Sequence, residues 1–159
     1  MNMLNLPNMR NFYIKTQSYI KVSSSKALEE YELQKYLSSR YDFIPKIHSL
    51  KLLDTYSEIT MDMVVNGTNL FEKYSDNSSD IPEWIWNKIR NIVQTLYYKE
   101  GIEYIDITPY NFMIDSNNKI WLIDFGHAYY TNVTMHKPSN WFLSEFIFDQ
   151  VNLFNPDFA

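Results

Sequence analysis

Residues 101–127 constrain the fold more than any other part of the chain. Two apolar runs, Phe-Met-Ile at 112–114 and Ile-Trp-Leu-Ile at 120–123, are separated by Asp-Ser-Asn-Asn at 115–118. Apolar runs predict short strands, and the residues between them favour tight turns. The segment is therefore predicted to be a loop followed by a β-hairpin.

Three polar residues flank this predicted hairpin. Asp106 lies in the loop, Asn111 follows five residues later, and Asp124 comes thirteen residues after Asn111. The hairpin would bring Asn111 and Asp124 to neighbouring strand ends, where their oxygens suit Mg²⁺ that keeps water and phosphate ligands. Asp106 is placed to accept or orient the proton of a nucleophile. The set points to phosphoryl transfer, which requires mainly positioning and charge neutralisation. An ordinary hairpin with surface Asp and Asn residues is the alternative.

The same residues resemble the protein kinase superfamily. Asp-Ile-Thr-Pro-Tyr-Asn at 106–111 looks like its catalytic loop, and Asp-Phe-Gly at 124–126 looks like its metal-binding motif. Leu-Tyr-Tyr-Lys-Glu-Gly-Ile at 96–102 resembles the helix end and turn before that loop. The resemblance implies ATP and Mg²⁺, with Asp106 as the catalytic residue and with Asn111 and Asp124 as metal ligands.

The loop departs from the family pattern of His-Arg-Asp, because this chain has Tyr104-Ile105-Asp106. Tyr104 can still pack under the loop as an aromatic ring. Ile105 cannot pair with a phosphorylated residue, so control by activation-loop phosphorylation is not expected. Thr108 stands where many Ser/Thr kinases have a lysine. These differences resemble small, atypical kinases.

Residues 11–22 predict two short strands around Thr-Gln-Ser at 16–18. Lys21, within Ile-Lys-Val, resembles the family's strand lysine that contacts the α- and β-phosphates, and Lys15 on the earlier strand is its competitor. Either could instead be a solvated strand lysine. There is no glycine before Gly67, so the Gly-rich hairpin that covers the phosphates in the family is missing or replaced.

Residues 26–38 predict a helix capped by the serines at 23–25. Glu30 shares one face with Leu33 and Leu37, and by resemblance it would pair with the strand lysine. A solvated acidic face is the competing interpretation, and the alternatives for the pairing are Glu29 and Glu32.

Residues 44–50 and 58–64 predict two further strands of the same sheet. The second resembles the hinge strand that holds adenine by backbone hydrogen bonds. By that resemblance Met61 is the gatekeeper, and the Asp62 carbonyl and the Val64 N–H face the base. A plain buried strand is compatible with the same residues.

The second half of the chain reads mainly as helices. A short helix is predicted at 70–74, and a longer one starts after an Asp80 cap, with Pro82 just inside, and runs to about Lys99. Its buried stripe is predicted to be Ile85, Ile89, Ile92, Val93 and Leu96.

A loop at about 127–138 and one helix at about 140–151 are expected to complete the chain. The helix is rich in aromatic residues and would cap the core of a reduced second lobe. His127 and His136 flank the site loop and are expected to be solvated or capping residues.

The predicted fold class is α+β, a bilobal kinase-like fold in one domain, residues 1–159. A small β-sheet lobe would span 12–64 and a reduced, mainly helical lobe 69–152, with nucleotide in the cleft between them. The chain is 45% hydrophobic with a net charge of −5, which favours a globular protein and shows no basic stripe for nucleic acid. Cysteine is absent, which excludes disulfides and thiolate metal sites.

No apolar run approaches the roughly 20 residues of a membrane span, so an intracellular, cytoplasmic protein is expected. The bias towards Asn, Tyr, Ile, Phe and Lys fits an AT-rich genome, such as that of a virus or parasite infecting a host cell. The leading hypothesis is transfer of the ATP γ-phosphoryl group to a hydroxyl of a protein or small molecule. The alternative is a pseudokinase, a binding or regulatory module without catalysis. The oligomeric state is left open.

Overall fold

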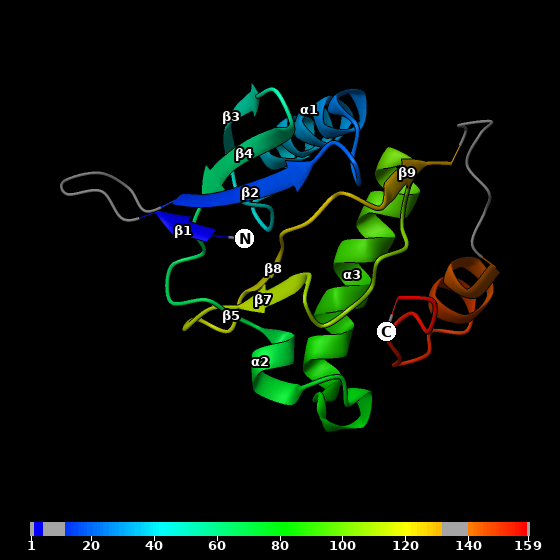
Figure 1. The fold of residues 1–159 in the computed structure, drawn as a ribbon. Helices are drawn as coiled ribbons and strands as arrows, with labels where there is room; N and C mark the ends of the chain where they lie inside the picture. The colour runs from blue at the N-terminus through cyan, green and yellow to red at the C-terminus, as the bar shows by residue number, and fades with distance from the viewer. Residues whose placement is uncertain (1, 5–11, 132–139, 159) are drawn as a thin grey trace. The chain divides into compact units, whose positions relative to one another are not determined.

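The structure, a computed structural model, describes residues 2–4, 12–131 and 140–158 (Figure 1). The chain divides into two compact units, Met1–Val65 and Asn66–Ala159. Each unit has its own hydrophobic core. Strands dominate the first unit and helices with short strands make up the second, so the predicted α+β class is confirmed.

The first unit is a four-stranded antiparallel sheet with one helix against it. The strand order is β1-β2-β4-β3. Helix α1 packs against β3 and β4 (Figure 1). The elements are β1 (Asn2–Leu4), β2 (Phe12–Ser18), α1 (Ser24–Arg40), β3 (Ile47–Leu52) and β4 (Tyr56–Asp62).

The prediction of two strands within residues 11–22 is wrong. Phe12–Ser18 is one continuous strand, paired along its whole length with β4. The turn comes later, where the N–H groups of Lys21 and Val22 both donate to the Ser18 carbonyl, at 3.0 and 2.9 Å. Thr16 and Gln17 therefore continue the strand, and the β-branched side chain of Thr16 is of a type that favours strands.

Helix α1 is longer than predicted by two residues at each end. Ser23 is its N-cap, and its hydroxyl accepts a hydrogen bond from the Lys26 N–H at 3.2 Å. One face is buried and consists of Ala27, Glu30, Leu33, Gln34 and Leu37. The serine cap and the buried face were both predicted from the sequence.

The two strands after α1 are confirmed with shifted boundaries. β4 alternates between buried and half-buried residues, with Ser57, Ile59 and Met61 facing inward. It ends at Asp62, two residues before the predicted end, so Val64 lies beyond the strand. The register of β3 on β4 shifts at His48, whose ring is 2.5 Å from the Asp62 carboxylate.

The second unit combines two small sheets with helices. Strands β5 (Thr68–Asn69), β7 (Phe112–Ile114) and β8 (Ile120–Leu122) form one sheet, in that order. Strands β6 (Ile102–Tyr104) and β9 (Ala128–Tyr130) form the other. The helical elements are α2 (Leu70–Tyr74), η1 (Ser78–Asp80), α3 (Glu83–Glu100) and the π-helix η2 (Trp141–Phe148).

Helix α3 confirms the long predicted helix and its buried stripe, because all five stripe residues are buried. The predicted cap is wrong. Pro82 occupies the N-cap position, and Asp80 belongs to η1, where it accepts a hydrogen bond from the Asn77 amide at 3.0 Å. Gly101 ends α3 in the left-handed conformation, with φ of 66°.

The predicted segments after Gly126 are revised as well. Residues 128–130 form β9 rather than loop, paired with β6, while 132–138 and His136 lie outside the described residues. The last helix is shorter than predicted and has π geometry. Trp141, Phe142 and Phe146 are buried, whereas Phe148 is exposed. Among the described residues, no helix is long and apolar enough to cross a membrane.

Candidate active site

The β7–β8 hairpin sets the positions of Asn111 and Asp124 in the second unit. Phe112 pairs with Leu122, and the Ile123 N–H donates to the Asn111 carbonyl at 3.1 Å, which extends the ladder by one step. Asn111 and Asp124 therefore leave the ends of adjacent strands, as the turn chemistry predicted. Asp115 closes the turn by accepting the N–H groups of Asn117 and Lys119 at 2.8 and 3.0 Å.

Asp106 is hydrogen-bonded to Asn111, and the charge of Asp124 acts on its carboxyl group. The Asn111 side-chain amide donates to the Asp106 carbonyl oxygen at 3.0 Å, and Asn111 is buried. Burial raises the pKa of the Asp106 carboxyl, and the charge of Asp124 raises it further. Hydrogen bonds from Asn111 and Thr108 and the charge of His127 lower this pKa, but the net shift is upward. A carboxyl held this way is suited to accept a proton.

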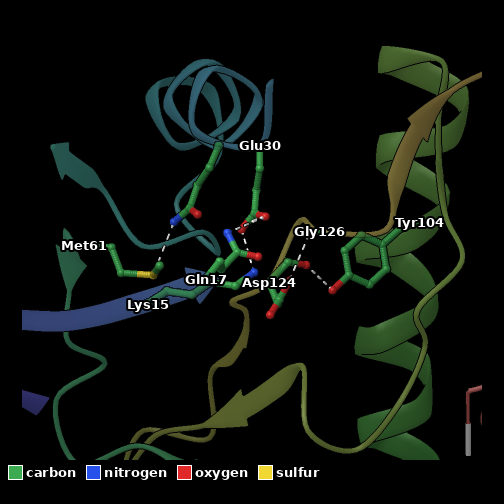
Figure 2. Close-up of polar contacts among 8 residues, drawn as sticks. Lys15, Gln17, Glu30, Met61, Tyr104, Asp124 and Gly126 are labelled. Carbon is green, nitrogen blue, oxygen red and sulfur yellow. Dashed lines mark hydrogen bonds and ion pairs between the residues drawn. The ribbon is translucent and has the colours of Figure 1, made fainter. Parts of the chain in front are cut away.

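Tyr104 fixes the backbone at Asp124. Its ring is fully buried and meets the ring of Phe125 edge to face, with centroids 5.8 Å apart. Its hydroxyl donates to the Asp124 carbonyl, and the Gly126 N–H donates to Asp124 Oδ1 at 2.9 Å (Figure 2). The sequence predicted a packed aromatic at Tyr104 but not its hydroxyl bond, which the residue type alone could have suggested.

The chemistry of Asn111 and Asp124 fits Mg²⁺. The Asn111 amide nitrogen is turned towards the Asp106 carbonyl, so its Oδ1 is the atom available as a hard ligand. The Asp124 carboxylate is oriented by the Gly126 N–H. Across the described ranges, no cluster of three or more His, Cys, Asp or Glu side chains could hold a metal alone. Water and phosphate oxygens would complete the coordination of a magnesium ion there.

In the first unit, Glu30 pairs with Lys15 and not with Lys21. The Lys15 ammonium is 2.6 Å from Glu30 Oε2, with side chains 15% and 2% exposed (Figure 2). Gln17, also on β2, donates to the other Glu30 oxygen at 3.4 Å. Lys21 is exposed in the turn after β2, because the strand ends three residues earlier. The lysine of the ion pair is therefore Lys15, the alternative to Lys21, and the glutamate is Glu30, as expected from the sequence.

The residues predicted to face adenine lie at the end of β4 and just after it. Met61, labelled in Figure 2, is fully buried. Its sulfur is 3.5 Å from the Gln34 side-chain nitrogen. The Asp62 N–H donates to the Lys46 carbonyl at 2.8 Å, so this N–H is engaged within the sheet. Val64 is buried beyond the strand end.

Thr108 is a residue of the site whose contact the sequence did not reveal. It is buried, and its hydroxyl hydrogen-bonds the Asp106 carboxylate, which lowers the pKa of that group. At the sequence level it appeared only as a departure from the family lysine. A hydroxyl two residues after an aspartate commonly bonds locally, which is the signal that was present.

A comparison with family models identifies the family of the chain. The model described as "Protein kinase domain" matches residues 8–147, which is most of the 159-residue chain. The chain belongs to the protein kinase domain family, and its α+β fold is kinase-like. No curated protein matches the chain at a significant level.

Proposed function

We propose that the protein is a phosphotransferase that moves the γ-phosphoryl group of ATP to a hydroxyl. The observation that carries this proposal is the joining of Asp106, Asn111 and Asp124 by one hairpin and one hydrogen bond. Membership of the protein kinase family supports the same reaction class. The hydroxyl belongs to a protein or to a small molecule.

Asp106 orients the attacking hydroxyl and accepts its proton. The hydroxyl oxygen forms a bond to the γ-phosphorus as the bond from that phosphorus to the β,γ-bridging oxygen breaks, and ADP leaves. The raised pKa of the Asp106 carboxyl favours acceptance of the proton. Asn111 and Asp124 would hold Mg²⁺ through Oδ1 and a carboxylate oxygen, and the ion would neutralise charge on the phosphates.

The first unit supplies the proposed nucleotide contacts. Lys15, in place of Lys21, is assigned to the α- and β-phosphates because it is the lysine that Glu30 holds in a fixed position. Met61 is the proposed gatekeeper, and the Asp62 carbonyl and Val64 N–H are the proposed backbone partners of adenine. These assignments rest on the family's pattern and on the order of residues along β4.

Thermal unfolding with ATP, with and without Mg²⁺, tests the proposal. A ligand at 100 times its Kd stabilises a fold by about 2.7 kcal/mol, which shifts Tm by several degrees. We expect a Mg²⁺-dependent shift in the wild type that Asp124→Ala abolishes. Asp76→Ala, at an exposed position, is the control and should keep the shift. The absence of a shift at millimolar ATP would contradict nucleotide binding.

Catalysis needs a second measurement, because a pseudokinase could bind nucleotide equally well. The lack of glycine before Gly67 favours this second candidate, since the family's phosphate-covering loop is rich in glycine. Asp106→Asn should retain the Mg²⁺-ATP shift and lose transfer of radiolabelled γ-phosphate to acceptors or to water. A wild-type protein that binds Mg²⁺-ATP but turns over no faster than Asp106→Asn is a binding module.

A further inference from the structure

A segment distant in sequence braces the loop that carries Asp106. Asn155 is fully buried, and its side-chain amide donates to the Ile105 carbonyl at 2.7 Å. Its backbone N–H donates to the Ile107 carbonyl at 2.9 Å. The two acceptors are the carbonyl groups of the residues immediately before and after Asp106, so Asn155 holds the backbone on both sides of it.

The backbone around Asp106 is a tight turn that regular secondary structure does not hold. The Ile107 N–H donates to the Ile105 carbonyl at 2.9 Å, so Asp106 is the central residue of a three-residue turn. β6 ends at Tyr104 and β7 begins at Phe112, which leaves the turn outside both strands. Its carbonyl groups therefore depend on other partners, and Asn155 supplies two N–H donors.

Asn155 is itself held in one orientation. Its Oδ1 accepts the Asp157 N–H at 3.0 Å, and its carbonyl accepts the Phe158 N–H at 3.1 Å. The donor and the acceptor of the side-chain amide thus each have a partner. The Phe158 ring lies 5.1 Å from the His127 ring, so the same segment also contacts the residue that follows Asp-Phe-Gly.

The segment is anchored to α3 at its other end. Arg90 of α3 donates to the Gln150 carbonyl at 2.9 Å and to Asn152 Oδ1 at 2.6 Å. The Asn152 amide donates in turn to Glu83 at 2.6 Å. Residues 150–158 therefore form a brace between α3 and the Asp106 turn. Asn155 makes the contacts with the turn. Among the described residues, the Asn152 side chain hydrogen-bonds only α3, where Arg90 also binds the Gln150 and Val151 carbonyls without it.

We propose that Asn155 is a positioning residue that sets the direction of the Asp106 carboxylate through the Ile105 and Ile107 carbonyls. Its catalytic consequence rests on the proposed function, whereas its effect on the turn does not. A small error in the placement of a reacting group can cost about 100-fold in rate. A residue that fixes both peptide groups around Asp106 is in a position to prevent such an error.

Amide hydrogen exchange of Asn155→Ala against Asn152→Ala tests the proposal without requiring activity. Asn155→Ala removes the bond to Ile105, while Asn152→Ala removes only contacts at the α3 end. We expect faster exchange across 105–111 in Asn155→Ala, beyond any effect of lowered global stability, and wild-type exchange there in Asn152→Ala. Equal exchange of that loop in both variants would overturn the proposal.

Kinetics then separate positioning from general destabilisation. We expect Asn155→Ala to lower kcat about tenfold or more while the KM for ATP stays within about twofold, and Asn152→Ala to leave kcat unchanged. An unchanged kcat in Asn155→Ala overturns the catalytic role. If the wild type transfers no phosphate, the proposed function fails, while the exchange comparison still decides whether Asn155 holds the turn.

The wild-type protein provides a test that survives a failure of Asn155→Ala to fold. The backbone N–H of Asn155 bonds to the Ile107 carbonyl, and the Ile107 N–H bonds to the Ile105 carbonyl. If the two bonds break together, both amides should show equal protection from hydrogen exchange at every denaturant concentration. Opening of Asn155 with much lower protection than Ile107 would show that the turn holds without the brace.

Discussion

At the scale of single residues, the first unit contains a largely buried ion pair between Lys15 and Glu30. Both side chains are largely withdrawn from water, and the Glu30 carboxylate is 2% exposed. A buried ion pair contributes little net stability, but the removal of one partner leaves an uncompensated charge. The pair therefore has different expected responses to single and double substitution.

Lys15→Met should destabilise the protein by about 3 kcal/mol, because it leaves the Glu30 carboxylate buried without its cation. The double variant Lys15→Met/Glu30→Leu should recover most of this loss. Lys21→Met alters the exposed lysine that the sequence suggested as the partner of Glu30. It should change the free energy of unfolding by less than about 0.5 kcal/mol. Urea unfolding monitored by far-ultraviolet circular dichroism, which detects the helix and strands of the first unit, measures all three, and equal effects at positions 15 and 21 would contradict the pair.

Asp106 is expected to lower stability at neutral pH. Its folded-state pKa lies above the ordinary value of 3.8, mainly through burial, so the folded state favours the protonated carboxyl. Stability from this group is present below the unfolded-state pKa and is lost as pH rises through the folded-state pKa. Ionised Asp106 thus lowers the stability of the folded state, and a role as catalytic base would explain why the chain has an aspartate there.

Asp106→Asn should therefore gain stability relative to wild type as the pH rises above about 3.8, because the neutral amide does not ionise. Denaturant unfolding at a series of pH values between 3 and 8 measures the difference. Asp76→Asn, at an exposed position, is the control and should show no comparable trend. A stability difference between Asp106→Asn and wild type that stays constant with pH would rule out the raised pKa of Asp106.

At the scale of elements, the end of α3 is set by one glycine. Gly101 has φ of 66°, and its N–H donates to the Leu96 and Tyr97 carbonyls. Its own carbonyl accepts the Thr131 N–H at 2.8 Å, which joins the helix end to the residue after β9. The turn leads directly into β6 and the Asp106 loop.

Gly101→Ala should cost about 1–2 kcal/mol, from the left-handed backbone alone. Among the described residues, an added Cβ would meet only the Thr131 hydroxyl, at an ordinary contact distance of 3.7 Å, so no clash with them contributes. Gly101→Asn should cost less, because asparagine tolerates this conformation better. Chemical denaturation of the two variants checks the order, and a larger cost for Asn than for Ala would point to crowding instead.

At the scale of the whole molecule, each unit has a core, and polar side chains join the elements of the second one. Arg90 is buried on α3, stacks 5.7 Å from the centre of the Phe146 ring, and donates to Gln150, Val151 and Asn152. One guanidinium thus connects α3, η2 and the segment that follows it.

Arg90→Met should destabilise the protein by about 2–4 kcal/mol, because it leaves the carbonyl groups of Gln150 and Val151 without their donor. In this variant, amide hydrogen exchange should rise across 150–158 at a lower denaturant concentration than in the β7–β8 hairpin. Lys88→Met is the control on the same helix, since Lys88 donates from an exposed position to the Asn118 carbonyl. A loss of stability as large in Lys88→Met would contradict the special role of Arg90.

The sequence by itself determined the α+β class, the main helices and the hairpin that carries Asn111 and Asp124. These features depend on neighbours within a few residues, such as the turn at 115–118 and the stripe along α3, so a local pattern contains the information. The glutamate of the buried pair was also predicted, because its place on an apolar helix face is visible in the spacing.

Only the tertiary structure decided which lysine meets Glu30 and what holds the Asp106 turn. Lys15 lies 15 residues from Glu30 in sequence, and the choice over Lys21 depends on where β2 ends against β4. Asn155 lies 50 residues from Ile105, and no local pattern marks it. Partners of this kind are chosen by strand register and by the path of the folded backbone, which a sequence pattern does not specify.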